Sequence, residues 1–198
     1  MPNRLLFLLL LCFSGSLFAD SPKPLEPEFT KDILERLDQG EAVFFERKKA
    51  RGHAGVAILI DGEKADVWRV LSDPESAPSY VPSLKSARIL LATGNTRLIA
   101  HEVKMPLMPK VNYQFEATEL PMRTIQFKQT TGDLSNFEGE WELYEGETYG
   151  RPDSVIVFYQ VYLNPGKLIP APLVQRSLRK DLPPMLECVR TRVYEMKN

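Results

Sequence analysis

The side chains that could carry out acid–base or nucleophilic chemistry are few in this sequence. Its 198 residues include two histidines, His53 and His101, and two cysteines, Cys12 and Cys188. None of them belongs to an HExxH, CxxC or GxSxG pattern, and the sequence has no glycine-rich loop of the phosphate-binding type. The sequence therefore lacks the motifs that zinc-dependent, nucleotide-dependent and nucleophilic mechanisms usually require. We expect no metal and no redox cofactor.

His101 is the histidine with an informative pattern around it. It shares alternate positions of a predicted strand with Arg97, Ile99 and Val103. If that side of the strand faces inward, His101 could touch a ligand or act as an acid or base. A hydrogen-bonded histidine of the core is the alternative, and the sequence leaves both open. Cys188 lies among helical residues, which favours a small buried apolar group over a nucleophile.

Alternating polar and apolar residues dominate the middle of the chain. Turn signals of Gly, Asn, Pro and Asp separate six such segments at hairpin spacing, which predicts an antiparallel meander. These segments are residues 84–94, 96–108, 110–120, 123–133, 136–146 and 153–165. Before them, the patterns predict a short helix, two strands and a second helix, over residues 28–40, 42–50, 53–61 and 62–73.

The elements that cover this sheet follow from its two faces and from the end of the chain. In "NFEGEWELY", glutamates alternate with apolar residues such as Trp141, which predicts a sheet covered on one side only. Apolar residues recur at helical spacing from Leu173 to Met196, so we expect a long helix, kinked or divided by Pro183 and Pro184. The prediction is an α+β fold, a curved antiparallel sheet wrapped around the C-terminal helix.

Two segments resemble a known family. "GEKADVWRVLSDPESAPSYVPSLKSARIL" is similar to the opening of the START-like, or polyketide cyclase/coenzyme Q-binding, superfamily, in which a helix ending in an aspartate precedes a proline-rich second helix. "NPGKLIPAPLVQRSLRKDLPPMLECVRTRV" resembles the segment that leads into the terminal helix of START lipid-transfer domains. The resemblance covers roughly residues 42–196. It implies a helix-grip fold whose apolar cavity binds or carries lipids and other hydrophobic molecules, and in some branches cyclises polyketides.

In the layout that this resemblance implies, "SDPESAPSYVP" (residues 72–82) lies across one mouth of the cavity as a rim or lid carrying Tyr80. A tight turn with Tyr80 packed into the core is the alternative. A second rim would carry Lys167, Leu168 and Ile169. The candidate ligand-binding residues are then Tyr80, Arg97, His101, Phe115, Phe127, Gln129, Trp141, Tyr159, Leu182 and Leu186.

The first nineteen residues, "MPNRLLFLLLLCFSGSLFA", predict a secretory signal peptide cleaved after Ala19, with an uncleaved anchor as the alternative. We therefore expect a periplasmic or secreted protein with a leader and short helix over residues 20–40 and a ligand-binding domain over residues 41–198. A formal net charge of −1 argues against nucleic acid as a partner. Basic clusters at residues 46–51 and 175–180 leave a transient membrane contact open.

The sequence leaves three functions open. The first is binding or transfer of a hydrophobic small molecule, lipid or quinone-like, that apolar walls remove from water. The second is a cyclase or hydrolase of the same fold that uses His101 with a nearby carboxylate. The third is an interaction protein whose cavity is filled by its own side chains.

Overall fold

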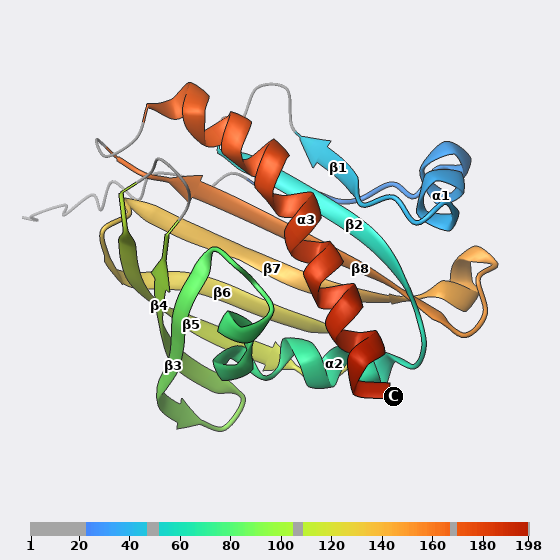
Figure 1. Ribbon diagram of the computed structural model, residues 1–198, viewed down its shortest axis with the longest axis horizontal. Helices are drawn as coiled ribbons and strands as arrows, with labels where there is room; N and C mark the ends of the chain where they lie inside the picture. The colour runs from blue at the N-terminus through green and yellow to red at the C-terminus, as the bar shows by residue number, and fades with distance from the viewer. Residues whose placement is uncertain (1–22, 47–51, 105–108, 167–169, 198) are drawn as a thin grey trace, which may run out of the picture.

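The computed structural model describes residues 23–46, 52–104, 109–166 and 170–197. A single antiparallel sheet of eight strands, in the order β1-β2-β8-β7-β6-β5-β4-β3, lies beneath one long helix (Figure 1). The strands are β1 (Val43–Glu46), β2 (His53–Asp61), β3 (Leu84–Thr93), β4 (Thr96–Val103), β5 (Val111–Leu120), β6 (Thr124–Gly132), β7 (Asn136–Glu145) and β8 (Ser154–Asn164). The helices are α1 (Lys31–Asp38), α2 (Lys64–Leu71) and α3 (Ala171–Lys197), with short 3₁₀ helices η1 (Pro74–Ser79) and η2 (Gly146–Tyr149). The predicted α+β arrangement is confirmed.

The main core lies between α3 and the sheet face that α3 crosses, which we call the inner face (Figure 1). Apolar residues alternate along each strand, so one set from each strand reaches this core. The apolar stripe of α3 packs against them, with Leu186 fully buried at its centre. Other members of the cluster are Val56, Ile58, Val67, Val157, Leu182, Val189 and Val193.

The two prolines do not divide α3, which runs without a break from Ala171 to Lys197. That part of the expectation is wrong because neighbouring Leu182 and Leu186 are buried in the core and hold both sides of the proline pair in one helix. Pro184 is exposed, so its ring needs no space inside the core. The Lys180 carbonyl nevertheless loses its helical donors at both the i+3 and i+4 positions, since both are proline.

A second apolar core covers the opposite, outer face of β1, β2, β7 and β8, so the expectation of a sheet covered on one side only is wrong. The segment before α1 and α1 itself provide the cover. Phe29 makes edge-to-face ring contacts with Phe45, Tyr144 and Tyr149, at centroid distances of 6.5, 5.3 and 5.1 Å. This core also contains Leu25, Ile33, Leu34, Leu37, Val43, Ala57, Leu59, Ile156 and Phe158.

Gln160 fixes the first described residues to this outer face. Its side-chain oxygen accepts a hydrogen bond from the Leu25 amide at 2.5 Å, and its amide nitrogen donates to the Leu25 carbonyl at 3.0 Å. The same nitrogen donates to Glu140 at 2.8 Å. Desolvation, reinforced by the neighbouring Glu142, raises the pKa of Glu140. A glutamine side chain thus pairs with the leader backbone in the way that a neighbouring strand would.

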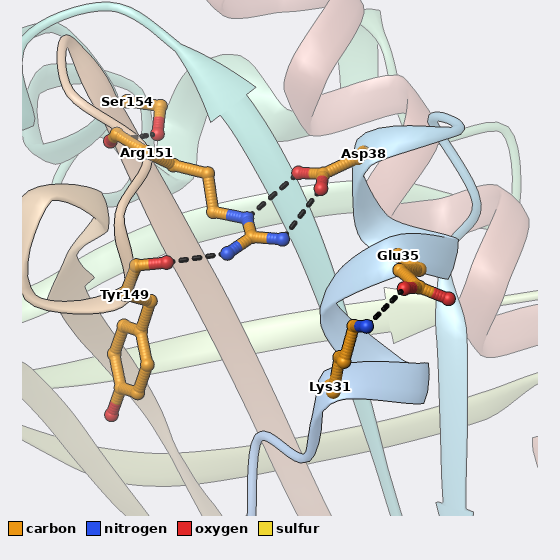
Figure 2. Close-up of polar contacts among 6 residues, drawn as sticks. All are labelled: Lys31, Glu35, Asp38, Tyr149, Arg151 and Ser154. Atoms are coloured by element: carbon orange, nitrogen blue, oxygen red, sulfur yellow. Dashed lines mark hydrogen bonds and ion pairs between the residues drawn. The ribbon is translucent and has the colours of Figure 1, made fainter.

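An ion pair joins α1 to the β7–β8 connection. Arg151 donates from Nε and Nη2 to the two oxygens of Asp38, at 2.8 and 2.5 Å, and from Nη1 to the Tyr149 carbonyl (Figure 2). The Arg151 guanidinium holds the pKa of the Asp38 carboxyl below its usual range.

Replacing Arg151 with alanine is expected to lower the free energy of unfolding by about 1 kcal/mol or less, because the pair is partly exposed and solvent screens it. Urea unfolding measures the change. Lys31→Ala is the control, because the Lys31 side chain is 92% exposed and its ion pair with Glu35 is long, at 3.6 Å (Figure 2). This substitution should change nothing measurable. An equal loss in both variants would contradict the structural role of Arg151.

Several expectations lie outside the described residues. These are the signal peptide at residues 1–19, most of the basic cluster at residues 46–51, and the second rim at Lys167, Leu168 and Ile169. Within the parts of the chain that the structure describes, no helix combines the length and apolar character needed to span a bilayer.

Candidate ligand-binding cavity

A cavity of about 240 Å³ lies in the inner core, between the sheet, η1 and α3. Its walls are mostly apolar and aromatic, because the inward positions of β4 to β8 carry such side chains. The lining residues are Leu71, Asp73, Pro74, Ala77, Tyr80, Val81, Ser83, Leu84, Ile99, His101, Val103, Tyr113, Phe115, Ala117, Glu119, Ile125, Phe127, Phe137, Trp141, Tyr159, Met185 and Val189.

The structure brings six of the ten candidate residues together in this wall: Tyr80, His101, Phe115, Phe127, Trp141 and Tyr159. The other four, Arg97, Gln129, Leu182 and Leu186, are not among the lining residues.

Those four residues have structural partners elsewhere. Arg97 forms an ion pair with Glu119 and donates to the Ser72 carbonyl at 2.7 Å. Gln129 donates to the Leu134 carbonyl at 2.8 Å and so supports the turn between β6 and β7. Leu182 and Leu186 belong to the solid part of the core. The apolar stripe of α3 was predicted from the sequence, but the α3 side chains that line the cavity are Met185 and Val189.

A pair of stacked aromatic residues forms the floor of the cavity. The rings of Phe127 and Tyr159 are nearly parallel, at 18° and 5.8 Å, and Trp141 packs 4.3 Å from Tyr159. Gly139 lies on β7, between the strands that carry Phe127 and Tyr159, and leaves room for this arrangement. A Cβ atom there would meet the Gln160 carbonyl oxygen at 2.0 Å and the Phe127 ring at 2.7 Å.

Gly139→Ala is therefore expected to destabilise the protein by about 2 kcal/mol, the usual cost of overpacking a core. Urea unfolding monitored by circular dichroism measures it. Gly94→Asn is the matched control, because an added Cβ at Gly94 meets nothing within 4 Å and asparagine tolerates the positive φ of 59° there. Equal stability of the Gly139 variant and the wild type would contradict the close approach.

His101 is the polar group that faces the cavity without a complete set of partners. Its Nδ1 lies 3.4 Å from the Tyr113 hydroxyl, whereas its Nε2 is buried and has no hydrogen-bond partner among the described residues. Phe115 packs edge-on against the ring at 4.8 Å. Burial lowers the pKa of His101 to about 4, so the imidazole is neutral at neutral pH. A neutral imidazole can offer Nε2 to one polar atom of a ligand.

Acid should destabilise the wild type more than it destabilises His101→Phe. An unfolded histidine begins to protonate near pH 6.5, and the folded one only near pH 4. The contribution of neutral His101 is therefore complete above pH 6.5 and is lost as the pH falls towards 4. Urea unfolding at about pH 7 and about pH 4.5 should show an extra loss of about 2 to 3 kcal/mol in the wild type. Equal losses would contradict the burial of the neutral ring.

Hydrogen bonds from Asp73 and Glu75 hold η1 as one wall of the cavity. Asp73 caps η1 by accepting from the Ser76 amide at 3.3 Å and the Ser76 hydroxyl at 2.5 Å. Glu75 accepts from the amide of Ile89 on edge strand β3 at 3.0 Å. Tyr80 packs against the core and also lines the cavity. Burial, with a smaller contribution from Asp73, raises the pKa of the Tyr80 hydroxyl to about 12.

Sequence reasoning missed several lining residues, and for some of them a signal was present. Tyr113 and Ala117 occupy the same alternate positions of β5 as Phe115, so strand periodicity would have included them. Asp73 and Glu119 are the carboxylates at the cavity, and one caps η1 while the other pairs with Arg97. Among the described residues, no three or more His, Cys, Asp or Glu side chains are arranged to hold a metal ion.

Comparisons with known proteins agree with this architecture. The sequence model of the family described as polyketide cyclase / dehydrase and lipid transport matches residues 60–190, and no curated protein matches the chain. A solved structure from Thermus thermophilus is 17% identical, with a TM-score of 0.65 over 74% of this chain and 99% of that one. A STAR-related lipid transfer protein from Xanthomonas axonopodis is 17% identical, with a TM-score of 0.64 over 76% and 91%.

The Zhui aromatase/cyclase from a Streptomyces species is 16% identical, with a TM-score of 0.55 over 71% of this chain and 90% of the other. At such low identity these likenesses concern the fold alone. They confirm the predicted START-like, helix-grip architecture.

Proposed function

Because the chain belongs to the polyketide cyclase / dehydrase and lipid transport family, we propose that it binds or transfers a hydrophobic small molecule, lipid or quinone-like. The apolar cavity carries the proposal, together with the buried His101 Nε2 that has no partner among the described residues. Such a wall removes a ligand from water, and one polar atom sets its orientation. We place this activity in the periplasm or outside the cell, on the strength of the signal-like pattern in residues 1–19.

Cavity size limits the part of the ligand that is enclosed. If each carbon-sized group takes about the volume of one water molecule, roughly 30 Å³, the space holds roughly eight such groups. An apolar body that loses about 200 Å² of exposed surface would gain about 5 kcal/mol, before the cost of association. The enclosed part is therefore one ring system or one short chain, rather than the two acyl chains of a phospholipid.

Mass spectrometry of the bound material tests the proposal directly. The chain is purified from its native envelope under mild conditions and extracted with organic solvent. A hydrophobic species in stoichiometric amount would support binding and would identify the ligand. An empty extract, followed by no binding to a panel of lipids and quinones, would overturn it and favour a core filled by side chains.

Substitution of His101 separates binding from catalysis. Under the proposed function, His101→Phe retains apolar ligands and loses only the preference for ligands with a polar atom near Nε2. A cyclase or hydrolase that used His101 as an acid or base would instead lose turnover and keep ligand retention. The pKa of about 4 makes His101 a weak base at neutral pH, which favours the binding role.

A further inference from the structure

A groove adjoins the cavity on the outside of the protein. Val81, Ser83 and Met185 line both spaces, so the groove begins where the cavity wall ends. It is larger, at about 470 Å³, and it lies between the start of β3 and the double-proline segment of α3. Its remaining lining residues are Pro82, Lys85, Lys104, Asp181, Pro184 and Cys188.

The groove is more polar and more cationic than the cavity. It carries two ammonium groups, on exposed Lys85 and Lys104, against the single carboxylate of Asp181. Lys85 donates to the Pro82 carbonyl at 2.7 Å, and this hydrogen bond to a neutral group does not cancel the ammonium charge. Asp181 accepts from the Ser177 hydroxyl at 2.5 Å.

The double proline adds a hydrogen-bond acceptor beside this groove. Helical carbonyls point along the axis towards the residue four positions ahead, which for Lys180 is Pro184 in the groove wall. Since neither Pro183 nor Pro184 has an amide proton, neither helical donor reaches that carbonyl. It can accept from the P–OH of a singly charged phosphate, whereas an ionised carboxylate has no donor for it.

From these observations we infer that the groove is a head-group subsite for an amphiphile whose apolar part occupies the cavity and whose head is anionic, a carboxylate or a phosphate. The inference rests on the proposed function and narrows its ligand class. The cavity encloses only part of a lipid-sized molecule, so the rest must emerge, and the shared residues Val81, Ser83 and Met185 provide a continuous path. The Asp73 carboxylate at the cavity disfavours an anionic head there, whereas the charge of Glu119 is balanced by Arg97.

Calorimetric titration with ten-carbon amphiphiles of equal tail length tests the inference on the purified chain. The probes are decanoate, decyl phosphate, decanol and decyltrimethylammonium. We expect the anionic probes to bind about fivefold more tightly than decanol, and the cationic probe more weakly, since each partly exposed ion pair contributes little. The better of the two anions identifies the head as carboxylate or phosphate.

Charge variants test whether the groove residues cause the preference for anionic probes. The double variant Lys85→Gln/Lys104→Gln should lose the preference for the anionic probes over decanol and bind decanol as the wild type does, whereas Asp181→Asn should increase the anionic preference. Lys128→Gln, at an exposed position on the outer face of β6, is the matched control and should change nothing. Equal binding of all probes by the wild type, or a preference that survives the double substitution, would overturn the subsite. Failure of every probe to bind, decanol included, would instead overturn the proposed function.

Discussion

Ala117→Phe is expected to abolish ligand binding while leaving the fold intact. Ala117 is 2% exposed and lies in the cavity wall, opposite Phe127 in the pairing of β5 with β6. A benzene-sized ring needs about 150 Å³, which is more than half of the cavity volume of about 240 Å³. The substituted ring would therefore take the place of the ligand. We expect the affinity to fall by about a hundredfold or more.

Thr118→Phe is the matched control, because Thr118 is the next residue of the same strand and is exposed on the outer face. It adds the same ring outside the cavity and should leave the affinity unchanged. Urea unfolding of both variants shows whether the fold is retained. Wild-type affinity in a folded Ala117→Phe variant would contradict the location of the site.

Phe29→Ala is expected to lower the free energy of unfolding by about 3 kcal/mol, because it removes the central ring of the outer core. Phe29 contacts three aromatic rings from β1, β7 and η2. Glu28→Ala, at the exposed neighbouring position, is the control and should stay within about 0.5 kcal/mol of the wild type. Urea unfolding measures both.

Ligand affinity should not change in Phe29→Ala under conditions where the variant remains folded, since the outer core and the cavity lie on opposite faces of the sheet. A loss of stability no larger than that of the control would show that the leader contributes nothing to the free energy of unfolding. A loss of affinity in the folded variant would show that the two faces are coupled.

The sheet and α3 were predictable because their patterns are periodic. A period of two along β5, β6 and β7 and the three- and four-residue spacing along α3 follow from burying one face of each element. The prediction that the proline pair divides α3 was wrong because it considered only the hydrogen bonds that proline removes. It did not consider the packing of Leu182 and Leu186 on either side of the pair. The same periodicity placed five candidate residues in the wall, whereas Tyr80, which follows η1, came from the family resemblance.

The outer core was missed because the segment before α1 has no period at all. Leu25 and Phe29 are isolated apolar residues in a proline-rich stretch, and only their distant partners give them a role. A signal was present in those partners: "VAILI" in β2 and "VIVFYQV" in β8 are apolar almost throughout, which is typical of strands buried on both faces. Arg97 was wrongly placed among the ligand-binding residues, because its partner Glu119 becomes its neighbour only when β4 pairs with β5.

The pairing of β2 with β8 has a consequence for synthesis of the chain. The nearest partners in sequence, Asp61 and Ser154, are 93 residues apart (154 − 61), and pairing cannot begin until β8 has left the ribosome. At about 5–20 residues per second, β2 waits for about 5–20 s without its central neighbour. During that interval a strand with seven buried positions in the native state is open to intermolecular pairing. Slower translation should therefore raise aggregation during expression, and the aggregating species should be chains that end before residue 154.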